Sequence, residues 1–149
     1  MSERMLRQRV LLIAVALAGA LGIVVASAPM SQPMSTQQIV LSGSNEVPPV
    51  TTSASGTGTV TINPDHTVSA SVTVTGMMAT ASHIHEGAAG TNGPVIVPFT
   101  KTGDNTFAAP DGAKLTESQY ASYKAGNLYV NVHSAKNPGG EIRAQLKGG

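Results

Sequence analysis

Short runs in which apolar and polar residues alternate place the strongest constraint on how this chain can fold. The clearest run is 67–75, where Val68, Ala70, Val72 and Val74 occupy every second position. Successive side chains of a β-strand point to opposite faces, so this period of two predicts a strand with one buried face. Thr, Ser, Val, Gly and Ala dominate the chain after its N-terminal segment, and this mixture suits short strands joined by tight turns.

Turn-forming residues separate these runs. Asn-Pro-Asp-His at 63–66 joins the run 55–62 to the run 67–75, which predicts a β-hairpin. Residues 46–50 contain two prolines without N–H groups, so they are expected to form a bend or an edge segment. Strands are expected at 38–42, 55–62, 67–75, 81–85, 94–99, 127–133 and 141–146. The predicted fold class is therefore all-β, an antiparallel β-sandwich or Greek-key barrel of seven or eight strands.

One short helix is expected at 117–125. Thr116 and Gln119 have the spacing of a capping box, in which each side chain bonds the backbone N–H of the other residue. Gly126 follows at the position where glycine commonly ends a helix. The sequence predicts no other helix after the N-terminal segment.

Composition excludes several classes of protein. Charged residues make up 11% of the 149 residues, aromatic residues make up 3%, and there is no Trp. Such a chain lacks the basic patch and the stacking aromatics of a nucleic-acid binder, so no nucleic-acid partner is expected. The chain contains no Cys, which excludes disulfides, thiolate metal sites and a cysteine-anchored lipoprotein.

The N-terminal segment has the pattern of an export signal. Arg4, Arg7 and Arg9 precede an apolar run at 10–28. Residues 1–28 are therefore expected to be a signal peptide or an N-terminal membrane anchor, since the run is also long enough to span a bilayer. Either outcome exports the rest of the chain, to the periplasm, to the extracellular space or to the outer face of the cytoplasmic membrane. Residues 29–36 are expected to be a flexible leader, and residues 37–149 form one domain.

Three of the four histidines lie in predicted strands. His83 and His85 point to one face of the strand 81–85, and Ile84 points to the other. His133 alternates with Leu128, Val130 and Val132 and so also lies on the side away from the apolar face of its strand.

Imidazole nitrogens suit late first-row metals, and His83, His85 and His133 are the predicted metal ligands. If the two strands are neighbours, the ring nitrogens should converge, because ligand nitrogens of one site lie roughly 3–4 Å apart. The alternative is that these histidines are solvated strand residues.

Glu86 is a candidate to orient one imidazole by a hydrogen bond to the ring nitrogen that does not bind the metal. The alternative is that this glutamate, at the end of a strand, is solvated. His66, at the tip of the predicted hairpin, is expected to lie far from the other histidines.

The chain resembles the CHRD domain family, named after chordin, over residues 39–146. The matching stretches are 41–43, 46–50, 82–87, 92–95, 128–133 and 137–143. The resemblance implies an exported domain, because the family is common in exported bacterial proteins. In chordin such domains belong to an extracellular regulator of growth factors, but its cysteine-rich modules have no counterpart here.

A second resemblance concerns the copper half of copper–zinc superoxide dismutase. His-Ile-His-Glu at 83–86 and Val-Asn-Val-His at 130–133 are similar to strands of the dismutase that carry copper ligands. Arg143 is placed similarly to the dismutase arginine that steers the anion, although a solvated strand arginine is the alternative. The zinc ligands and the cysteines of the dismutase have no match. The resemblance implies a superoxide-dismutase-like fold and a three-histidine copper site without zinc beside it.

These observations leave three hypotheses for function. The first is an exported domain that binds a metal ion, copper or alternatively zinc, as a carrier, buffer or electron-transfer protein. The second is a non-metal adhesion or protein-interaction module at the cell surface. Membrane anchoring by residues 10–28 is compatible with each of these hypotheses. The third is a dismutase-type enzyme, which the sequence supports least because it shows no general acid or base.

Overall fold

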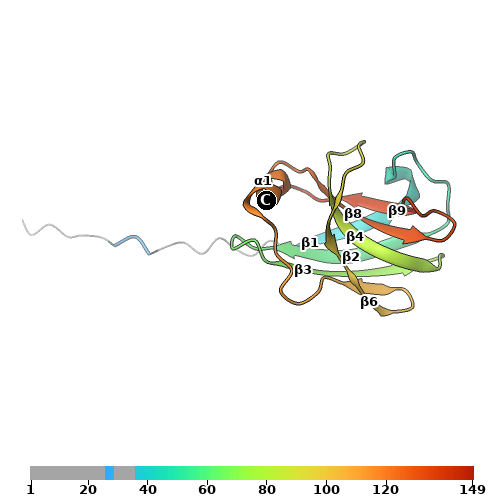
Figure 1. Cartoon of the computed structure of the whole chain (residues 1–149), viewed down its shortest axis with the longest axis horizontal. Helices are drawn as coiled ribbons and strands as arrows, with labels where there is room; N and C mark the ends of the chain where they lie inside the picture. The colour runs from blue at the N-terminus through green and yellow to red at the C-terminus, as the bar shows by residue number, and fades with distance from the viewer. Residues whose placement is uncertain (1–25, 29–35) are drawn as a thin grey trace, which may run out of the picture. The chain divides into compact units, whose positions relative to one another are not determined.

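The computed structural model describes residues 26–28 and 36–149. The predicted signal segment 1–28 and leader 29–36 lie outside these residues, apart from 26–28 and Thr36. Within the described part of the chain, no helix is long and apolar enough to cross a membrane. The domain from Thr36 onward is described below (Figure 1).

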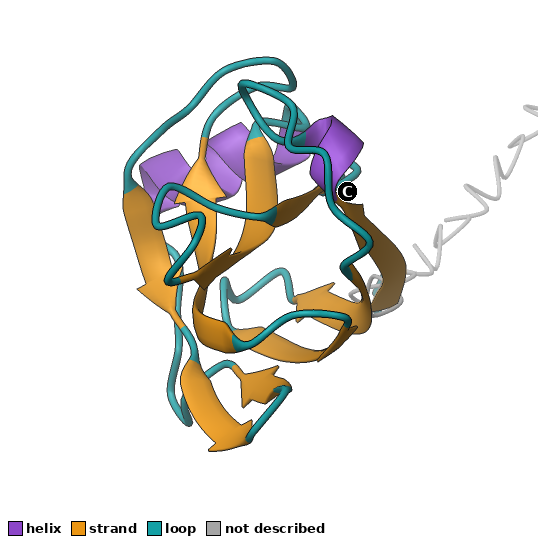
Figure 2. Cartoon of the chain, turned by 90° about the vertical axis from the view of Figure 1, so that its right-hand side faces the viewer, coloured by secondary structure: helices purple, strands orange, loops and turns teal. Residues whose placement is uncertain are grey.

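Nine antiparallel strands form one continuous sheet in the order β5-β4-β8-β9-β1-β2-β3-β7-β6. The strands are β1 (Thr36–Ser42), β2 (Ser55–Ile62), β3 (Val68–Thr75), β4 (Ala79–Glu86), β5 (Val95–Pro98), β6 (Thr100–Gly103), β7 (Thr106–Ala108), β8 (Leu128–Ser134) and β9 (Ile142–Gln145). The two edge strands, β5 and β6, are separated only by Phe99, whose N–H donates to the carbonyl of Ser82 at 3.0 Å. Figure 2 shows the strands curving around one interior, so the sheet is a nearly closed barrel.

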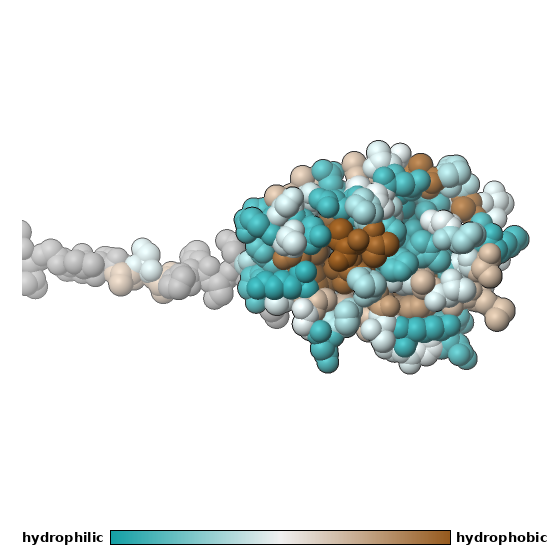
Figure 3. All heavy atoms as spheres, viewed as in Figure 1, coloured by the Kyte–Doolittle hydropathy of each residue, from teal (hydrophilic) through white to brown (hydrophobic). Residues whose placement is uncertain are grey.

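The interior contains the apolar set of each alternating run. Val60, Val72, Ile84 and Val130 are all fully buried there. This arrangement confirms the predicted all-β antiparallel fold. The outer surface is mostly polar, and Figure 3 shows one compact apolar patch on the face turned to the viewer.

The strand count exceeds the predicted seven or eight because of a small hairpin. Its strands β6 and β7 lie outside the strands that the sequence predicts. Every residue of β6 is exposed, so the strand buries neither face and its sequence shows no apolar alternation.

The local signals of the sequence are confirmed elsewhere. Helix α1 (Glu117–Lys124) begins with the predicted capping box of Thr116 and Gln119. Gly126 follows it with φ +79°. At the predicted hairpin between β2 and β3, the His66 N–H donates to the Asn63 carbonyl at 2.8 Å. The bend at 46–50 forms no strand and follows the short 3-10 helix η1 (Gly43–Asn45).

Strands β4 and β8 pair directly, which is the condition that the metal hypothesis requires. In this register Ala81 lies opposite His133, His83 opposite Asn131, and His85 opposite Tyr129. Residues directly opposite in an antiparallel pair share a face of the sheet. The three histidines therefore share the outer face of the barrel.

A candidate metal centre

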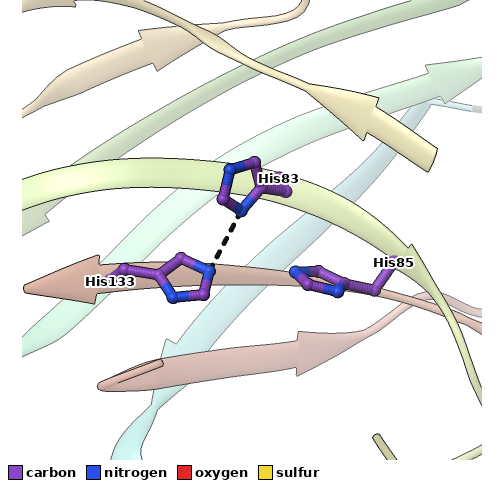
Figure 4. A group of neighbouring side chains, drawn as sticks. All are labelled: His83, His85 and His133. Atoms are coloured by element: carbon purple, nitrogen blue, oxygen red, sulfur yellow. Dashed lines mark hydrogen bonds between the residues drawn. The ribbon is translucent and has the colours of Figure 1, made fainter. Parts of the chain in front are cut away.

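The three histidine side chains converge on the outer face of β4 and β8 (Figure 4). His83 Nδ1 lies 3.0 Å from His133 Nε2. One ring nitrogen from each of His83, His85 and His133 can be chosen so that all three lie within 4.8 Å of one another. The predicted convergence is confirmed. A small adjustment of the rings would bring the nitrogens to the spacing of about 3–4 Å expected around one ion.

Backbone carbonyls fix the orientation of two of the rings. His85 Nδ1 lies 2.9 Å from the Gly93 carbonyl, and His133 Nδ1 lies 2.9 Å from the Pro138 carbonyl. Since a carbonyl only accepts, each Nδ1 carries the proton in the neutral ring and each Nε2 presents a lone pair. This is the common arrangement of metal-binding histidines, whose second nitrogen donates to a carbonyl or carboxylate.

The Nε2 atom of His85 is buried and has no hydrogen-bond partner among the described residues. His85 as a whole is 7% exposed. A buried polar atom without a partner costs about 1–3 kcal/mol, so a native structure that contains one calls for an explanation. A metal ion bound to this lone pair would supply the missing interaction.

Burial disfavours the protonated form of two of the rings, His83 and His85. Desolvation, followed by the neighbouring His133 and His85, lowers the pKa of His83 from 6.5 to about 4. Burial also lowers the pKa of His85, against the hydrogen bond to the Gly93 carbonyl, which raises it. A metal must compete with the proton for imidazole, so a ring that resists protonation is suited to bind one near neutral pH.

Arg143 lies beside this cluster but is buried, with 1% of its surface exposed. Its guanidinium lies 3.4 Å from the centre of the Tyr129 ring, which stacks in turn on His85 at 4.8 Å. Its NH groups donate to the carbonyls of Thr91 at 2.7 Å and Ala88 at 3.2 Å. The guanidinium thus anchors the loop 87–94 over the histidine face. The alternative of a solvated arginine is wrong, and donors already bonded to carbonyls are not free to steer an anion.

Glu86 lies on the other side of the strand. Its carboxylate accepts a hydrogen bond of 2.6 Å from the hydroxyl of Ser122 on α1. In the described part of the chain, no hydrogen bond joins Glu86 to a histidine. The alternation of β4 explains this, because Glu86 shares a face with Ile84 and not with His85.

His66 does not belong to the cluster. Its ring stacks on Tyr120 at 4.3 Å, and its Nε2 lies 3.7 Å from a carboxylate oxygen of Glu117. The expected separation of this hairpin histidine from the other three is confirmed.

Two buried residues near the histidines were not predicted. Asn131 is 2% exposed and lies between His83 and Arg143 in the register of β4, β8 and β9. Its place on the His133 face of β8 is readable from alternation alone. Glu46 is 4% exposed and follows η1, and no sequence signal places it here.

The fold and the site together define a class, an antiparallel β-barrel domain with a three-histidine cluster on its outer face. The model of the CHRD domain family matches residues 37–146, and the chain belongs to this family. No curated protein and no solved structure matches the chain.

Proposed function

We propose that this CHRD domain is exported and binds copper through His83, His85 and His133. The observation that carries the proposal is the buried Nε2 of His85, which has no partner among the described residues and is held beside two further imidazoles. Solvated strand histidines would not need a carbonyl to orient them or a loop to cover them. The role that fits is a carrier, a buffer or an electron-transfer protein.

The donor set supports copper. The cluster consists of imidazoles alone, whereas Mg²⁺ and Ca²⁺ prefer oxygen ligands. Among divalent first-row ions, Cu²⁺ binds a given nitrogen site most tightly, and Zn²⁺ is the alternative. Export rests on the arginines and the apolar run of residues 1–28.

Isothermal titration of the purified protein with Cu²⁺ and with Zn²⁺ tests the proposal. The wild-type protein is expected to bind one ion, with the higher affinity for Cu²⁺. His83→Ala removes one ligand and should weaken copper binding by more than about 100-fold. This loss exceeds the one that is typical when a residue that only hydrogen-bonds to a ligand is replaced.

His66→Asn is the matched control, because it removes a histidine outside the cluster. Asn tolerates the positive φ of 73° at this position. This variant should bind copper as the wild type does. Equal weakening by both substitutions, or no binding by the wild type, would refute the proposal and favour the adhesion module.

A further inference from the structure

Three buried polar atoms lie close together on the outer face without hydrogen-bond partners among the described residues. They are His85 Nε2, Asn131 Oδ1 and Glu46 Oε1. Buried polar atoms without partners are unfavourable, so each one calls for an explanation. The proposed metal accounts for the first atom. The second, the amide oxygen of Asn131, requires a further explanation.

Asn131 lies among the three histidines. It is directly opposite His83 in the β4–β8 ladder, and His85 is two residues further along β4. His133 is two residues along β8 and therefore shares the face of Asn131. Asn131 therefore lies on the same face as the three proposed ligands and is a near neighbour of each.

The amide of Asn131 is oriented by contacts on its far side. A β-carbon built on Gly140 would lie 2.6 Å from Asn131 Nδ2 and 2.6 Å from Glu46 Oε1, so both groups crowd this glycine. The amide nitrogen is thus turned toward Gly140 and the Glu46 carboxylate. Because the oxygen of a planar amide lies on the other side from the nitrogen, Oδ1 is turned away from Glu46. The Asn131 side chain also contacts the side chain of His85.

We infer that Asn131 Oδ1 supplies a fourth, oxygen donor to the ion held by the three histidines, directly or through one bound water, and that the site therefore selects a divalent ion over Cu⁺. This inference rests on the proposed function and states which oxidation state the site takes. Cu⁺ favours soft sulfur ligands, whereas Cu²⁺ and Zn²⁺ accept mixed nitrogen and oxygen donors. The charge of the Glu46 carboxylate behind the amide is opposed by the neighbouring Arg143 guanidinium, so the preference rests on the oxygen donor.

The test compares the affinities of the protein for Cu²⁺ and for Cu⁺, the latter measured without oxygen by competition with a Cu⁺ chelator. Asn131→Leu keeps the approximate size of the side chain and removes the oxygen. It is expected to weaken Cu²⁺ binding at least about tenfold and to change Cu⁺ binding by less than about threefold. The electron paramagnetic resonance spectrum of bound Cu²⁺ should change in the same variant.

Asn131→Asp keeps an oxygen at the same position and adds a negative charge. It should raise the ratio of Cu²⁺ to Cu⁺ affinity above that of the wild type. Thermal unfolding of each metal-free variant shows whether it folds. If the Leu variant does not fold, the Asp variant alone tests the inference.

Equal effects of Asn131→Leu on the two oxidation states, or no effect on Cu²⁺, would overturn the inference, as would an unchanged or lower ratio in Asn131→Asp. In those cases the wild type still binds metal and the proposed function stands. A wild-type protein that binds neither ion would instead refute the proposed function itself.

Discussion

In two of the three rings of the site, the nitrogen that faces the cluster is determined by the contact that holds the other ring nitrogen. The Gly93 and Pro138 carbonyls bind Nδ1 of His85 and His133 and leave Nε2 facing the cluster. The sequence predicted which histidines would meet, because strand alternation assigns a side chain to a face. It could not predict these partners, because every residue carries a carbonyl and only the fold determines where it points.

The stability of the metal-free domain should depend on pH through His83. Its pKa is about 4 in the folded domain and near 6.5 in the unfolded chain. Between these values the unfolded state binds more protons, so the free energy of unfolding should fall as the pH is lowered from about 6.5 to 4. The slope for one proton is at most about 1.4 kcal/mol per pH unit, and less for a ring that is only partly buried. The lowered pKa of His85 acts in the same direction.

Urea unfolding at several pH values between 4 and 7, with a chelator present, measures this dependence. His83→Gln cannot be protonated, so its stability should fall less steeply over the same range. A metal-free wild-type protein that becomes more stable on acidification to pH 4.5 would contradict the buried, neutral state of this ring.

The loop between β4 and β5 converts an outward-facing strand surface into a half-buried site. Alternation places His85, Tyr129 and Arg143 on the outer face, where solvated residues would ordinarily be expected. The loop 87–94 covers this face and is held by Arg143 and by the Tyr129 hydroxyl, which accepts from the Gly93 N–H at 3.1 Å. The glycines of this segment are typical of a loop, but nothing in their pattern indicates what the loop covers.

Gly93 is the residue of this loop that least tolerates a side chain. A β-carbon at Gly93 would lie 1.6 Å from the Glu86 carbonyl oxygen, so the backbone of Gly93→Ala must move. We expect a loss of about 2–4 kcal/mol of stability. We also expect weaker copper binding, because the carbonyl that orients His85 is displaced.

Gly139→Ala is the matched control, since a β-carbon there meets nothing within 4 Å. Position 139 adjoins Pro138, whose carbonyl holds His133. The substitution should leave the free energy of unfolding unchanged within about 0.5 kcal/mol. Thermal unfolding and copper titration of both variants provide the comparison. Equal behaviour of the two variants would show that close packing at Gly93 does not support the site.

Across the whole domain, the sequence predicted most of the strands, the turn at 63–66 and the capped helix, because each has a local signal. The prediction missed β6 and β7, whose residues form strands by pairing with β3 and with each other and not by alternation. It also missed Glu46, which reaches the site from a bend far away in sequence. Features that depend on contacts between segments far apart in the sequence could not be predicted from the sequence alone.

The proposed site holds one metal ion among His83, His85 and His133. Anomalous diffraction at the copper absorption edge, recorded from crystals of the copper-loaded protein, tests it most directly. We expect one dominant peak, with three imidazole nitrogens at about 2.0–2.1 Å from it. A dominant peak at His66 or elsewhere, with the three-histidine cluster free of metal, would refute the proposed site.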